Sequence, residues 1–182
     1  GAAPFSLAPG SLFAASSGEL HAADLAPLDV ALEAGFLPVV YGDVIADRTW
    51  RASIASTEAV FVALARGLAP RVTQALWLGE TSGVWDAQGE TLPEISTLDQ
   101  AGDALGGSRG TDVTGGMRHR VQAALELATL GVTSTIADGR EPGTIERFAR
   151  GVAEKKIDLG VVKTVLGPIS QPSTGDQIRL KK

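Results

Sequence analysis

The chain has 182 residues, of which 44% are hydrophobic and 20% are charged, proportions typical of a single globular domain. Its formal charge of -5 argues against a protein whose main task is to hold a nucleic-acid backbone. The absence of cysteine excludes disulfides and thiolate metal sites, and no apolar run is long enough to span a bilayer. We therefore expect a cytoplasmic protein with neither nucleic-acid nor membrane partners.

Apolar periodicity predicts helices that alternate with short strands. We expect helices over residues 25–34, 56–68 and 114–130 and from Pro142 to about Gly151, and buried strands over 36–41, 75–78 and 132–137. Ser56 suits the N-cap position of the second helix. This alternation predicts an α/β fold with a largely parallel sheet, whose strand-to-helix loops gather at one edge. The pattern fades near the end, so we divide the chain into a domain, 1–154, and a tail, 155–182.

The strongest local feature is a glycine-containing loop, 111–120, that leads directly into a predicted helix. Gly115 and Gly116 remove side chains where the chain must pass close to a ligand. The helix N-terminus behind them suits a phosphate, and Arg120 lies one turn along on the same helix. The plainer alternative is a loop that only allows a tight turn into a helix.

Three other loops place polar residues next to glycine at the ends of predicted strands. Glu80 follows the strand at 75–78, Gly42 and Asp43 follow the strand at 36–41, and Arg140 follows the strand at 132–137. Each loop has an ordinary structural alternative, in which it is a turn with an exposed side chain.

The order of these loops resembles the amino-acid-kinase superfamily, and within it the isopentenyl phosphate kinases. The matching pieces are Val-Val-Tyr-Gly-Asp-Val, Gly-Glu-Thr-Ser-Gly-Val-Trp-Asp, Asp-Val-Thr-Gly-Gly-Met and Asp-Gly-Arg-Glu-Pro-Gly. The similarity extends over roughly residues 5–150. It implies a three-layer α/β/α sandwich with a mainly parallel sheet, lacking the N-terminal portion of the family fold.

The resemblance also implies a function. The protein would use ATP and Mg²⁺ to phosphorylate a small phosphate monoester, isopentenyl phosphate, and would form a homodimer. Two alternatives stay open: a kinase of the same fold that acts on fosfomycin, an amino acid or another carboxylate, and a non-catalytic nucleotide-binding fragment. A folded fragment without any ligand is a third.

Site residues carry over by position from the same resemblance. Gly42 and Asp43 would border the phosphorylated substrate. The residues implied for the nucleotide are Glu80, Gly83, Trp85, Asp86, Thr114, Gly115, Gly116, Met117 and Arg120. Two of them depart from the family pattern, since Glu80 replaces the usual Asp and Arg120 replaces the usual Lys.

Two further elements of the family pattern do not occur in this sequence. One is a Lys-x-Gly-Gly-Ser loop that grips the transferring phosphate, and the other is a glycine-rich loop with a substrate-binding histidine. Phosphoryl transfer depends on positioning and charge neutralisation. We therefore expect this chain alone to have lost most of the transfer rate.

Overall fold

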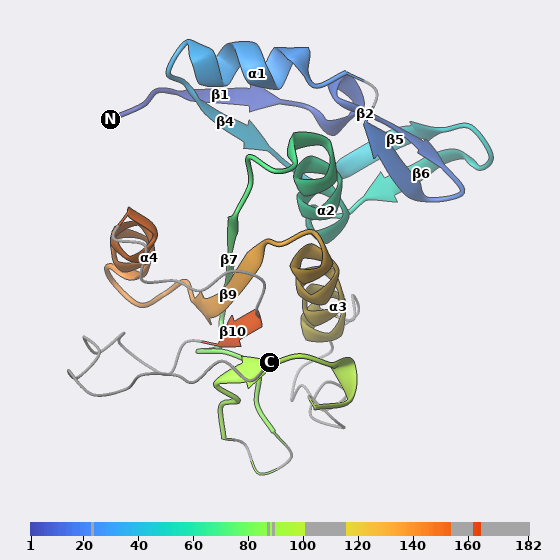
Figure 1. Cartoon of the computed structure of the whole chain (residues 1–182). Helices are drawn as coiled ribbons and strands as arrows, with labels where there is room; N and C mark the ends of the chain where they lie inside the picture. Colours follow the sequence, from blue (N-terminus) through green and yellow to red (C-terminus); the bar gives the residue numbers. More distant parts are fainter. Residues whose placement is uncertain (23, 87, 89, 101–115, 154–161, 165–182) are drawn as a thin grey trace.

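The computed structural model describes residues 1–22, 24–86, 88, 90–100, 116–153 and 162–164 (Figure 1). Its helices are α1 (Ala26–Glu33), α2 (Thr57–Leu68), α3 (Gly116–Thr129), α4 (Thr144–Ala153) and a short 3-10 helix, Pro9–Ser11. Its strands are β1 (Pro4–Leu7), β2 (Phe13–Ser16), β3 (Glu19–Ala22), β4 (Leu37–Val40), β5 (Asp43–Asp47), β6 (Arg51–Ala55), β7 (Gln74–Gly79), β8 (Glu94–Ile95), β9 (Thr133–Asp138) and β10 (Val162–Thr164). None of these described helices has both the length and the apolar character needed to cross a membrane.

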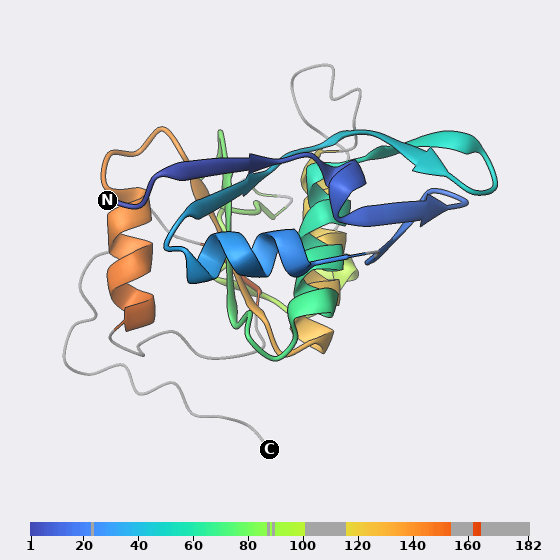
Figure 2. The ribbon, with the colours of Figure 1, turned by 90° about the horizontal axis from the view of Figure 1, so that it is seen from above.

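The strands form three sheets with both parallel and antiparallel pairings. β1 pairs with β4, and the other sheets have the orders β7-β9-β10-β8 and β3-β2-β5-β6. The pairs β1–β4, β2–β5, β7–β9 and β9–β10 are parallel, whereas β2–β3, β5–β6 and β8–β10 are antiparallel. In both views the strands β7 and β9 lie between α4 on one side and α2 with α3 on the other (Figures 1 and 2). The predicted α/β class with three layers is confirmed.

The predicted helices are present, with one shifted boundary. Ser56 caps α2 as expected, because its side chain accepts a hydrogen bond from the amide of Ala59 at 3.1 Å. The last helix begins at Thr144, two residues after Pro142. Gly143 has φ of 80° in the left-handed region, and a residue with that backbone cannot continue into a right-handed helix.

Two of the differences from the sequence expectation concern β4 and β10, and the strands β1, β2, β3, β5, β6 and β8 were not predicted either. The strand at 36–41 was expected to be buried, yet in β4 Leu37 is 57% exposed and Val39 is 42% exposed. The reason is that, among the strands the structure describes, β4 pairs only with β1, and α1 covers it on one face (Figure 1). The second difference is β10, which lies in the tail for which the sequence predicted no element and which extends the β7–β9 sheet.

The apolar interior consists of two clusters, one for each end of the molecule. One lies between α2, α3 and the β7–β9 sheet, where the rings of Phe61 and Trp77 pack with centroids 4.4 Å apart. The other joins the β2–β5 sheet to α1 and the opposite flank of α2, and includes Leu12, Phe13 and Ile45. Because α2 contributes to both clusters, it fixes the position of one sheet relative to the other.

A buried carboxylate holds the β2–β3 and β5–β6 turns together. Asp47 is only 5% exposed, and its oxygens accept backbone hydrogen bonds from Ser17 (3.1 Å), Gly18 (2.7 Å), Thr49 (2.8 Å) and Trp50 (2.8 Å). Burial alone would raise the pKa of Asp47, but the four N–H donors outweigh it and hold that pKa well below its ordinary value. The charged form of this carboxylate is therefore part of the fold.

We expect Asp47→Asn to lower the unfolding temperature by several degrees at pH 7, because an amide offers one acceptor oxygen to four donors. The folded pKa lies below the unfolded value of about 3.9, so the carboxylate stabilises the fold above that pH, and the contribution is lost as pH falls through the folded pKa. Thermal unfolding at pH 7 and at about pH 3 should show a smaller acid-induced loss in the variant than in the wild type. The control is Asp43→Asn, because the Asp43 carboxylate is exposed and, among the described residues, is hydrogen-bonded only to the amide of Val44. Equal destabilisation by both substitutions would contradict this role of Asp47.

Candidate functional site

The ends of two parallel strands and the starts of two helices meet at one edge of the molecule. β7 and β9 are in parallel register, with Gly79 opposite Asp138 at their carboxyl ends. Figure 2 shows α2 and α3 running side by side in the same direction, with their N-termini at the edge where β7 and β9 end. In open α/β sheets, ligands bind at this kind of edge.

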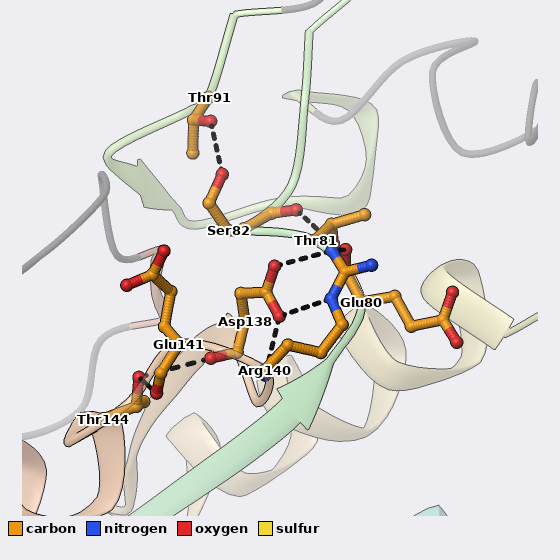
Figure 3. Close-up of polar contacts among 9 residues, drawn as sticks. Glu80, Thr81, Ser82, Thr91, Asp138, Arg140, Glu141 and Thr144 are labelled. Carbon is orange, nitrogen blue, oxygen red and sulfur yellow. Dashed lines mark hydrogen bonds and ion pairs between the residues drawn. The ribbon is translucent and has the colours of Figure 1, made fainter.

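At this edge an arginine links the loops that follow β7 and β9 (Figure 3). The carboxylate of Asp138 accepts hydrogen bonds from the amide of Arg140 (2.8 Å), from its Nε (3.0 Å) and from its Nη2 (2.7 Å). Nη2 of Arg140 also donates to the main-chain carbonyl of Glu80. The hydrogen bonds from the Arg140 side chain lower the pKa of Asp138 to about 2, and Asp138 raises the pKa of Arg140. We refer to Asp138, Arg140 and the Glu80 carbonyl as the Arg140 bridge.

A second arginine reaches the same strand end from α3. A β-carbon placed on Gly79 would lie only 2.5 Å from Nη1 of Arg120, so this guanidinium lies directly over the last residue of β7. Arg140 contacts the next residue, Glu80. The structure therefore brings Glu80 and Arg120, which the sequence predicts for the nucleotide, to consecutive positions of one strand end.

The loop after β7 folds back on itself as a small hairpin. The amide of Asp86 donates to the carbonyl of Glu90 at 2.8 Å, and the Asp86 carboxylate accepts from the amides of Gln88 and Glu90, each at 2.9 Å. The carbonyl of Gly83 accepts from the hydroxyl of Thr81 at 3.0 Å. Trp85 is 47% exposed on this hairpin. Asp86 is thus engaged in shaping the loop, while about half of the Trp85 surface is exposed.

The other predicted nucleotide residues lie at the start of α3 or outside the described part of the chain. Gly116 opens the helix, and Met117 packs partly buried against the apolar cluster rather than out toward solvent. Thr114 and Gly115 lie outside the described residues.

The two predicted substrate residues lie beside the start of α2. A β-carbon on Gly42 would lie 2.9 Å from the carbonyl oxygen of Ala55 and 3.3 Å from the amide nitrogen of Thr57. Asp43 begins β5, is exposed, and accepts a hydrogen bond from the amide of Val44 at 2.7 Å. Gly42 therefore has a packing reason to be glycine, because it lets the chain pass close to the backbone that enters α2.

A separate cavity of about 400 Å³ lies along the flanks of α2 and α3, next to the β2–β3 turn. Arg66 on its wall pairs with Glu19 at 3.4 Å and with Glu126. His119 lines this cavity. None of the residues predicted for substrate or nucleotide belongs to its described lining, so we place the candidate site at the strand ends.

The sequence underestimated one part of the site. From the sequence, Arg140 is either a partner for an anion or simply an exposed arginine in a loop, and Asp138 has no role of its own. A carboxylate that ends a predicted strand, followed two residues later by arginine, was the available signal. The partner Glu80 lies 60 residues away along the chain, and only the pairing of β7 with β9 brings it near.

Comparison with known proteins identifies relatives. The sequence profile of the Amino acid kinase family matches residues 2–138. The chain is 41% identical to the isopentenyl phosphate kinase of Haloferax volcanii over 131 residues, and this alignment covers 68% of the chain and 51% of that protein. It is 34% identical to the isopentenyl phosphate kinase of Methanothermobacter thermautotrophicus over 154 residues, and this alignment covers 80% of the chain and 57% of that protein. The chain thus spans about half the length of the curated relatives it matches.

Solved structures give the same result for the fold. A structure described as isopentenyl phosphate kinase matches with a TM-score of 0.65 at 27% identity, over 82% of this chain and 56% of the other. A product complex of the T. acidophilum isopentenyl phosphate kinase matches with a TM-score of 0.55 at 19% identity, over 91% of this chain and 60% of the other, and at that identity it supports the fold alone. The resemblance stated from the sequence is confirmed.

Alanine at Gly42 and alanine at Gly79 should have different effects on stability. In Gly42→Ala the added carbon meets backbone atoms, so we expect a loss of about 1–3 kcal/mol in the free energy of unfolding. In Gly79→Ala it meets the far end of the flexible Arg120 side chain, which can move, so stability should change little. Urea unfolding of both variants checks this. An equal loss in the two variants would contradict the described packing.

Proposed function

The chain belongs to the amino acid kinase family, and on that premise we propose that it is an ATP-dependent phosphotransferase of the isopentenyl phosphate kinase type. Its reaction would move the γ-phosphate of ATP onto the phosphate of isopentenyl phosphate, giving isopentenyl diphosphate and ADP. The observation that carries the proposal is the guanidinium of Arg120 over the carboxyl end of β7, at the edge where α3 begins.

The chemistry requires charge neutralisation more than covalent help from the protein. An oxygen of the acceptor phosphate attacks the γ-phosphorus in line with the departing ADP, and both groups are anionic. The N-terminus of α3 directs the N–H groups of its first turn and the positive end of the helix dipole toward a ligand, and Arg120 offers a forked cation one turn further on. Together they suit the phosphates of the nucleotide, while the exposed Trp85 ring suits the base by stacking.

Mg²⁺ is part of the proposal. The described residues contain no group of three or more His, Asp or Glu side chains placed to hold a metal. In kinases Mg²⁺ usually keeps several waters and is bound by one or two carboxylates together with the substrate phosphates. The ion would therefore enter with ATP and would help to neutralise the phosphate charge.

The acceptor would lie near Gly42 and Asp43, beside the start of α2. Isopentenyl phosphate is proposed as the acceptor because both relatives are isopentenyl phosphate kinases. The family resemblance is also our reason to propose a homodimer and a cytoplasmic location. A non-catalytic nucleotide-binding role is the second candidate. It needs only the nucleotide side of the site, which Arg120 and the start of α3 would provide at the end of β7.

Titration calorimetry with ATP and Mg²⁺ tests the nucleotide site. Arg120→Ala should weaken binding about tenfold or more, because a hydrogen bond to a charged group contributes about 1.5–3 kcal/mol. Arg118→Ala is the matched control, since it removes the same charge from an exposed position on the same helix. Absence of ATP binding by the wild type, or equal losses in the two variants, would overturn the site.

Phosphorus NMR of the wild type with ATP, Mg²⁺ and isopentenyl phosphate then separates the two functions. Isopentenyl diphosphate should form at a slow but measurable rate if the chain is a kinase. ATP binding without transfer to this acceptor would instead support the non-catalytic alternative.

A further inference from the structure

We propose that Arg140 is a positioning residue for the nucleotide: it fixes the main chain at Glu80 and so presents the Glu80 carboxylate to the nucleotide hydroxyls. This inference rests on the proposed function, since it concerns how the same site would hold ATP. Arg140 is not required to touch the phosphates in this role.

The Arg140 side chain is held rigidly by its neighbour. Nε and Nη2 of its guanidinium both donate to the Asp138 carboxylate, at 3.0 Å and 2.7 Å. Two parallel hydrogen bonds fix the plane of the guanidinium as well as its position. Asp138 is itself fixed, because it ends β9 in register with Gly79 and the amide of Gly139 donates to the Gly79 carbonyl at 2.8 Å.

The second N–H of Nη2 in this rigid group is directed at the loop after β7. Nη2 of Arg140 donates to the carbonyl of Glu80, the first residue beyond the strand. The next described anchor of the loop is the hydrogen bond within Thr81–Gly83, which is local and does not attach the loop to the sheet. Arg140 is thus the described side chain that ties the start of this loop to the neighbouring strand.

The charges at the bridge leave the Glu80 carboxylate available. Asp138 neutralises Arg140, and in Figure 3 the Glu80 carboxylate lies on the far side of the guanidinium from Asp138. Within the described part of the chain this carboxylate has neither a hydrogen bond nor an ion pair, and its charge, after that of Asp138, helps to raise the pKa of Arg140. A carboxylate accepts only, so its natural ligand here is a hydroxyl donor, such as those of a ribose.

Lysine cannot replace arginine in this bridge. A single ammonium group can approach either Asp138 or the Glu80 carbonyl, but it has no planar fork to hold both in fixed geometry. This separates positioning from simple charge, because Arg140→Lys keeps the charge and loses the fork. The matched control is Arg150→Ala, which removes an exposed arginine from α4.

The experiment combines hydrogen exchange with two ligands, ATP and inorganic tripolyphosphate, each with Mg²⁺. In the free protein, Arg140→Ala and Arg140→Lys should speed amide exchange in residues 80–86 about tenfold, whereas Arg150→Ala should not. Both Arg140 variants should bind ATP about tenfold more weakly, which corresponds to the loss of one charge-assisted hydrogen bond, and should bind tripolyphosphate as the wild type does.

Each other outcome overturns a different claim. Equal weakening for ATP and tripolyphosphate, with rescue by lysine, would make Arg140 a direct phosphate ligand and would contradict positioning. Unchanged exchange and unchanged ATP affinity in the Arg140 variants would overturn this inference while leaving the proposed function intact. A wild type that binds no ATP would overturn the proposed function and the inference with it.

Discussion

The candidate site depends on the parallel register of β7 with β9. That register places Gly79 opposite Asp138 and brings both strands to an end at the same level. From there, Arg120 covers Gly79 and Arg140 reaches Glu80. A slip of one residue would turn Asp138 to the other face of the sheet and would move Arg140 away from the Glu80 carbonyl, so the Arg140 bridge could not form.

The two arginines at the end of β7 differ in whether their charge is paired within the protein. Arg140 is neutralised by Asp138 within the protein, so its effect is geometric. Arg120 has no ion pair with a described residue and lies one turn from the start of α3, so it is the better placed cation for a phosphate. The candidate site thus combines one fixed internal ion pair with one guanidinium that lies over the strand end, and the unpaired guanidinium is the group that suits a phosphate.

How much the sequence predicts depends on how far apart the interacting residues lie. Helices such as α2 follow from local signals, namely a capping Ser56 and an apolar periodicity. The β5–β6 hairpin was missed because Val44 and Ile54 face solvent opposite one another, which removes the usual alternation. Asp47 was missed because its donors at Ser17 and Gly18 come from a distant turn. The Arg140 bridge to Glu80 was missed for the same reason, since its donor and acceptor are 60 residues apart.

A nucleotide site where β7 and β9 end and α3 begins is tested most directly by a ¹H–¹⁵N NMR titration of the chain with ATP and Mg²⁺. We expect the largest chemical-shift changes in residues 79–86, 116–120 and 138–143, with the β2–β3 and β5–β6 turns unaffected. Changes centred instead on the cavity around Arg66, or on the turns held by Asp47, would contradict it.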